Sequence, residues 1–174
     1  MHWLVVVILV SAVMILLGLG LSDLKHRLLP NRWVAAYALL FPLFAASASL
    51  GFSLFFWHVL LGALAFFVFF LLFMTGVMGG GDVKLGTAVF LWAGPHLALP
   101  VLLITAWLGG ALGIVGWLAD RRCLARRMPA QHGLFSGMLR WVSARRGVPY
   151  GVGLAAGGLF ASWSFYLYWA ARLI

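Results

Sequence analysis

Only three side chains in this 174-residue chain carry a carboxyl group: Asp23, Asp82 and Asp120. Asp120 stands beside Arg121 and Arg122 at the end of an apolar stretch, so a solvated position at a membrane surface explains it. Asp23 follows the first apolar stretch and Asp82 precedes the fourth one. Two carboxyl groups that share a proton can hydrolyse a peptide bond, because the ionised one deprotonates water and the protonated one polarises the scissile carbonyl. Asp23 and Asp82 are therefore candidate catalytic residues.

Each of these two aspartates could also be a structural residue at a helix end. Asp82 could cap a helix N-terminus, and Asp23 could pair with Lys25 or Arg27. Both could instead relay protons in a small transporter or channel subunit, since ionisable groups at membrane depth usually mark a pathway or a site. If they form a catalytic pair, the helix ends favour an ionised Asp82, at a helix N-terminus near Lys84, and a protonated Asp23, at a helix C-terminus.

Three consecutive glycines, Gly79, Gly80 and Gly81, precede Asp82. They place no side chain beside the carboxylate, so an extended peptide could come close to it. The sequence therefore predicts a site that admits a polypeptide backbone.

Histidine, cysteine and serine offer no competing chemistry. Cys123 is the single cysteine, so it forms neither an internal disulfide nor a zinc-binding pair. Ser22 and Ser136 have no adjacent base that would make either one a nucleophile. No two of the five histidines have the i, i+4 spacing of a helical metal site, and we expect them at membrane interfaces: His2, His26, His58, His96 and His132. We expect no metal and no cofactor.

The elements that must position the aspartates are membrane helices. The chain is 65% hydrophobic and only 9% charged, and several apolar runs reach the roughly 20 residues needed to cross a bilayer. We predict an all-α integral membrane protein, one polytopic domain over 1–174, with the first apolar run retained as a span. The six expected helices cover 3–21, 33–50, 52–75, 83–94, 97–118 and 150–171. Tryptophans near the expected span ends are predicted to anchor them at the interfaces: Trp3, Trp33, Trp57, Trp92, Trp117 and Trp169.

The distribution of lysine and arginine predicts the orientation. With six spans and the N-terminus outside, every Lys and Arg except Arg172 falls in a cytoplasmic loop, as the positive-inside rule requires. The formal charge of +9 is thus topological and does not indicate nucleic-acid binding. We expect the basic cytoplasmic loop 119–148 to bind anionic lipid headgroups. This orientation places Asp23 and Asp82 at the same, cytoplasmic membrane face.

Three segments resemble motifs of one enzyme family. Residues 79–85, GGGDVKL, resemble the GxGD signature of the type IV prepilin peptidases. Residues 23–31, DLKHRLLPN, are similar to the first motif of that family, an aspartate followed by basic residues and an apolar-Pro-Asn step. Residues 148–151, VPYG, open the last apolar run and are a third resemblance. Together the three segments extend over nearly the whole chain.

The resemblance implies a membrane aspartyl endopeptidase of the bacterial inner membrane that removes short basic leaders from prepilins or pseudopilins without a metal. Matched by position, the catalytic aspartates are Asp23 and Asp82, the motif glycines are Gly79 and Gly81, and Lys84 aligns with the lysine of the signature. The implied partner is a prepilin or pseudopilin helix. The oligomeric state stays open.

The chain differs from the larger members of this family, which carry a cytoplasmic insert with paired cysteines and also methylate the pilin. It has no such insert, so we predict neither methyltransferase activity nor S-adenosylmethionine binding. Its size and VPYG segment look more like the short peptidases of tight-adherence (Flp-type) pilus systems. A GxGD protease of the presenilin or signal-peptide-peptidase kind is a rival, although the small size and the motif at 23–31 count against it.

Overall fold

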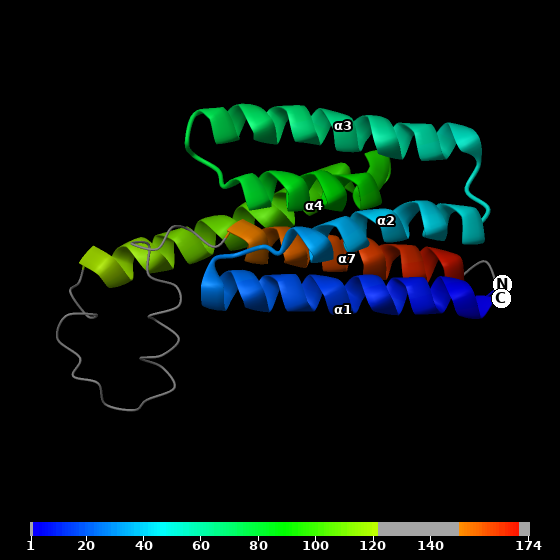
Figure 1. Ribbon diagram of the computed structural model, residues 1–174, viewed down its shortest axis with the longest axis horizontal. Coiled ribbons are helices and arrows are strands. Elements are labelled where there is room, and N and C mark those ends of the chain that lie inside the picture. Colours follow the sequence, from blue (N-terminus) through cyan, green and yellow to red (C-terminus); the bar gives the residue numbers. More distant parts are fainter. Residues whose placement is uncertain (1, 122–149, 171–174) are drawn as a thin grey trace.

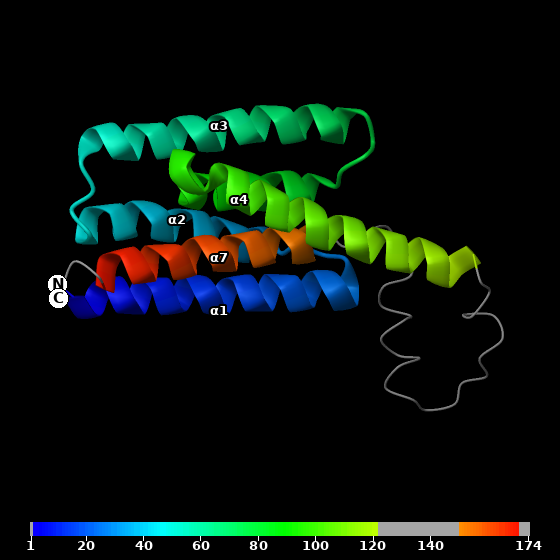
Figure 2. The ribbon, with the colours of Figure 1, turned by 180° about the vertical axis from the view of Figure 1, so that it is seen from behind.

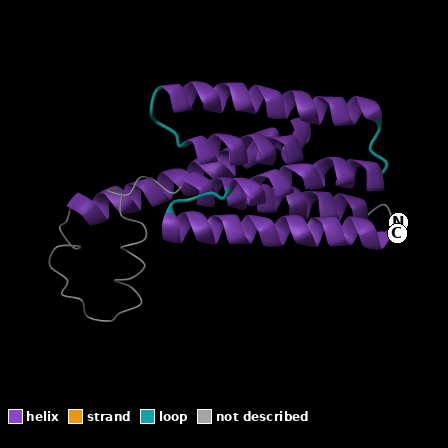
Figure 3. Ribbon diagram, viewed as in Figure 1, coloured by secondary structure: helices purple, strands orange, loops and turns teal. Residues whose placement is uncertain are grey.

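Helices make up almost all of the described chain. The computed structural model describes residues 2–121 and 150–170, which are helical apart from short connections (Figures 1 and 3). The five helices are α1 His2–His26, α2 Asn31–Ser47, α3 Phe52–Met74, α4 Gly80–Arg121 and α7 Tyr150–Ala170. The prediction of an all-α protein is thus confirmed for these ranges. The expected basic loop lies outside the described residues from position 122 onward.

Helix α4 is broken at Gly94, where the chain reverses direction. Gly94 has φ 61° and ψ −179°, a backbone conformation that side chains disfavour. The two legs on either side of it correspond to the expected helices 83–94 and 97–118. The second leg runs back toward the start of α4 and extends beyond the rest of the bundle (Figures 1 and 2).

The bundle is held together by α7 and α4. Helix α7 packs against α1 and α4, while α4 also packs against α2 and α3. Trp92 on the first leg of α4 is fully buried; its ring stacks on Tyr37 at 5.6 Å between centroids and meets Phe44 at 5.4 Å. Its indole N–H donates to the backbone carbonyl of Tyr37, 3.0 Å away. The prediction that Trp92 is an interfacial anchor is therefore wrong.

His58 is likewise a core residue. Its side chain is 2% exposed, and a ring nitrogen lies 2.9 Å from the backbone carbonyl of Leu91. The ring stacks on Phe41 with 5.0 Å between centroids. A buried imidazole with a hydrogen-bond partner is stable inside a bundle, so the interfacial position predicted for His58 is wrong.

Several helices meet the length and composition needed to cross a membrane. The candidates among the described residues are Trp3–His26, Phe52–Met74 and Gly80–Val115, the last of which covers both legs of α4. Helix α3 exposes apolar side chains such as Phe66 and Phe67, 47% and 59% exposed, as expected of a surface that faces lipid. The structure thus supports a multi-pass membrane protein.

Candidate active site

Three helix ends meet at the end of the bundle opposite the N-terminus. There α1 ends, α4 begins after the connection from α3, and α7 begins (Figure 1). Asp23 lies in the last turn of α1 and Asp82 in the first turn of α4. Gly151 is the second residue of α7. The fold therefore gathers three motif segments that are far apart in the sequence.

Asp23 is enclosed by the start of α7. Its side chain is only 5% exposed. The backbone N–H of Val152 donates to its carboxylate, with 3.2 Å between the nitrogen and Oδ2. A Cβ added at Gly151 would stand 2.8 Å from the carboxyl carbon of Asp23, so the carboxylate packs directly on the glycine backbone.

Asp82 is half-buried and lies over the glycines that precede it. A Cβ at Gly79 would stand 3.1 Å from Oδ2 of Asp82, and the backbone of Gly79 hydrogen-bonds to this carboxylate. Gly81 instead packs closely against Leu29, because a Cβ added at Gly81 would stand 3.2 Å from the Cβ of Leu29. The predicted motif glycines thus leave room for Asp82 and for the segment that follows α1.

The two predicted carboxylates are close enough to interact electrostatically, and Arg27 acts on both of them. Asp82 lies in the first turn of α4, and Asp23 accepts a hydrogen bond from the first turn of α7. Both carboxylates thus face a helix N-terminus, although Asp23 also ends its own helix. Helix ends alone therefore do not distinguish the ionised partner from the protonated one, and that assignment stays a prediction.

The connection between α1 and α2 brings Arg27 to the site. The N–H of Arg27 donates to the backbone carbonyl of Asp23 at 2.9 Å, after which the chain leaves the helix through a left-handed conformation at Arg27, φ 56°. The hydroxyl of Ser22 donates to the carbonyl of Leu28 at 2.8 Å. These bonds fix the path of the chain between Asp23 and the start of α2.

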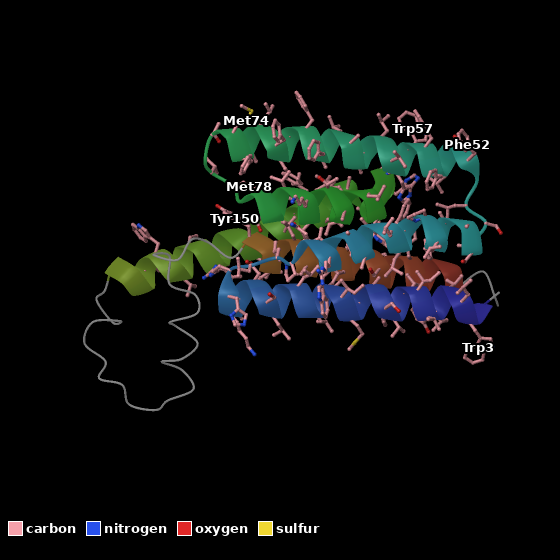
Figure 4. The ribbon with its side chains drawn as sticks, in the orientation of Figure 1. Trp3, Phe52, Trp57, Met74, Met78 and Tyr150 are labelled. Carbon is pink, nitrogen blue, oxygen red and sulfur yellow. The ribbon has the colours of Figure 1, made fainter. Side chains whose placement is uncertain are left out.

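An apolar pocket adjoins the site. Its volume is about 280 Å³, and it lies between α3, the second leg of α4 and the start of α7. Met78 and Tyr150 both line it, and each precedes the glycine that contacts one of the two aspartates. Figure 4 shows both side chains at the same end of the bundle. The pocket is thus lined by the residues that directly precede the two aspartate-contacting glycines.

Sequence reasoning missed part of this site. It treated Arg27 only as a possible partner of Asp23, and it gave the VPYG segment no role. The action of Arg27 on Asp82 had no local signal, because these residues lie on different segments of the chain. Nothing in the sequence showed that Gly151 and Val152 would contact Asp23, because that contact joins residues more than a hundred positions apart.

The remaining question about the site is whether a cation or a metal site lies beside the two aspartates. Lys84, two residues after Asp82, bonds to the side chain of Asn31. Within residues 2–121 and 150–170, no group of three or more His, Cys, Asp and Glu side chains could hold a metal ion. The chemistry that the described site can support is therefore that of two interacting carboxylates with a nearby guanidinium.

The chain matches a known protein family over most of its length. Residues 4–114 match the type IV leader peptidase family, a range that includes Asp23, Gly79, Asp82 and Lys84. No curated protein and no solved structure is significantly similar to the chain.

Proposed function

Because the chain belongs to the type IV leader peptidase family, the aspartic prepilin peptidases, we propose that Asp23 and Asp82 are its catalytic pair. The observation that carries this proposal is the electrostatic interaction of the two carboxyl groups. They are two of only three side-chain carboxyl groups in the chain. The substrate is a prepilin or pseudopilin precursor, whose short leader the enzyme removes for pilus assembly or secretion.

In the proposed mechanism the pair holds a single proton. The ionised carboxylate accepts a proton from the attacking water, and the protonated one donates a hydrogen bond to the carbonyl of the scissile peptide. The proton then passes to the leaving amine, which returns the pair to its starting state. Arg27 interacts with both carboxylates, so it offsets the negative charge that the pair carries while it holds a single proton.

The proposed arrangement in the membrane has six spans, the N-terminus outside and the active site at the cytoplasmic face of the bacterial inner membrane. Two observations support it. The chain reverses at Gly94, so the two legs of α4 count as two spans. The described lysines and arginines lie at helix ends on the side of the aspartates, as the positive-inside rule expects of a cytoplasmic face. Lys25 and Arg27 lie at and just after the end of α1, Arg32 and Lys84 near the starts of α2 and α4, and Arg121 ends the second leg of α4, which extends beyond the bundle on this side.

The substrate approaches this site from the membrane. Its apolar helix packs among the spans, and the pocket beside Met78 and Tyr150 supplies an apolar surface next to the carboxylates. A basic leader is repelled by the cationic end of the bundle, so docking depends on apolar packing. We further propose that the chain is a GxGD peptidase of the tight-adherence (Flp-type) kind, on the strength of its VPYG segment.

Co-expression with an Flp-type prepilin, in a host without other prepilin peptidases, tests the proposal. Leader loss is followed on a gel for the wild type, Asp23→Asn and Asp82→Asn. Asp120→Asn is the matched control, because it removes the chain's remaining side-chain carboxylate. We expect cleavage by the wild type and the control and none by the other two at equal membrane levels.

Cleavage that persists in Asp23→Asn or Asp82→Asn would exclude the pair. The alternative role of these residues as proton relays would then be supported if both substitutions abolish proton flux through vesicles that contain the protein. The family match favours the peptidase, since it assigns the chain to proteases.

A further inference from the structure

The first turn of α7 holds the carboxylate of Asp23 in two ways. The N–H of Val152 donates to Oδ2 at 3.2 Å. A Cβ added at Gly151 would stand 2.8 Å from both Cγ and Oδ2 of Asp23 and 3.1 Å from its Cβ. Real Cβ atoms essentially never approach so closely, so this packing requires glycine.

The N–H of Val152 is free to make this bond because of its position. Val152 is the third residue of α7, and the first N–H groups of a helix have no acceptor within it. The carboxylate of another helix accepts one of them here. This bond joins α1 to α7 at the one end of the bundle where the aspartates lie.

The other glycines of α7 have different neighbours. A Cβ at Gly153 would meet the backbone carbonyl of Thr105 at 2.8 Å, and one at Gly158 would meet Leu16 at 3.0 Å. These positions allow close packing of helices, as small residues do in membrane bundles. Of the α7 glycines, Gly151 is the one whose added Cβ would meet a carboxylate.

We infer that Gly151 and Val152 are positioning residues for Asp23: the glycine leaves the space in which the carboxylate lies, and the N–H fixes its orientation. This gives the VPYG segment a function, since its last residue, Gly151, leaves the space that the Asp23 carboxylate occupies. The catalytic consequence rests on the proposed function, whereas the effect on the carboxylate itself does not.

Carboxyl infrared bands of the full-length protein in detergent test the inference without proteolysis. The band of Asp23 is the one lost in Asp23→Asn. We expect it to shift in Gly151→Ala, which crowds the carboxylate, and in Val152→Pro, which removes the N–H at a helix position where proline is tolerated. Gly153→Ala is the matched control, because its Cβ meets a neighbour equally closely but away from Asp23.

Kinetics with a prepilin substrate give the second readout. Misplacement of a reacting group by about 1 Å costs on the order of 100-fold, so we expect a loss of that size in kcat for Gly151→Ala with little change in KM. Gly153→Ala is expected to retain most of its kcat even if its melting temperature falls equally.

The outcomes separate this inference from the proposed function. An Asp23 band that is unchanged in either folded variant, Gly151→Ala or Val152→Pro, overturns it, as does an equal loss of kcat in Gly153→Ala. If the band shifts in both variants but the wild-type protein itself cleaves no prepilin, the positioning is upheld and the proposed function alone is overturned.

Discussion

Lys84 on α4 donates a hydrogen bond to the side-chain carbonyl of Asn31 at the start of α2, with 3.1 Å between Nζ and Oδ1. Asn31 ends the segment that begins with Asp23, and Lys84 follows Asp82 by two residues. The bond therefore ties the two aspartate-bearing segments together at their exposed edge. It assigns Lys84 a structural contact.

If Lys84 only ties the segments together, Lys84→Met and Asn31→Leu should act through the same bond. Each should lower stability in detergent by about 0.5 to 1 kcal/mol and slow cleavage a few-fold, because the bond is exposed. The double variant should be little worse than either single one. Additive losses in melting temperature and rate would show that the two residues act independently.

The helices were predictable because their residues are uniformly apolar over the required length. The expected ranges 52–75 and 150–171 start at the same residues as the observed α3 and α7 and end one residue after the last residue of each described helix. Even the break at Gly94 was indicated by the Gly-Pro step that follows the fourth apolar run. The carboxylate pair was predictable for a different reason, namely that acidic residues are so scarce in this chain.

Contacts between helices could not be predicted in this way. An apolar helix shows little difference between its faces, so position near a span end did not distinguish Trp92, which is fully buried, from Trp57, which is 52% exposed. The same limit concealed the contact of Asp23 with Gly151 and Val152, since nothing local to either segment specifies the partner.

The different environments of the two tryptophans predict different costs of substitution. Trp92→Phe removes the donor to the Tyr37 carbonyl and leaves a gap in the core, so it should destabilise the protein by about 1 to 3 kcal/mol. Trp57→Phe, at an exposed position, should change stability by less than about 0.5 kcal/mol. Thermal unfolding in matched detergent measures both, and equal losses would contradict the burial of Trp92.

The guanidinium of Arg27 should matter for rate because it interacts with both carboxylates. The interaction of two unit charges near a protein surface, at an effective dielectric of about 20, is worth on the order of 1 kcal/mol or more. We therefore expect Arg27→Gln to lower kcat by about tenfold and Arg27→Lys to retain most of it. Both variants keep a non-glycine residue at position 27, where the backbone is left-handed, so they carry the same backbone strain as the wild type.

Arg32→Gln is the control for that prediction, since Arg32 is exposed at the start of α2. Cleavage rates at saturating substrate should be close to wild type in Arg32→Gln. A similar loss in the two glutamine variants would mean that general positive charge at this face, rather than Arg27 itself, supports the reaction.

The reversal of α4 at Gly94 should depend on glycine for two separable reasons. Its φ of 61° strains any side chain, and an added Cβ would meet the imidazole ring of His58. Gly76 shares only the first reason, because its φ is 74° but nothing lies within 4 Å of an added Cβ. Gly76→Ala should thus cost about 1 to 2 kcal/mol from strain, and Gly94→Ala a further 1 to 3 kcal/mol or so from crowding.

A double-variant cycle with His58→Ala isolates the crowding. Gly94→Ala should cost less in the His58→Ala background than in the wild type, because the ring that it meets is gone, whereas the cost of Gly76→Ala should be the same in both. Unfolding in detergent gives each free energy. If Gly94→Ala costs the same with and without His58, the ring does not pack against the reversal, and backbone strain alone accounts for the glycine.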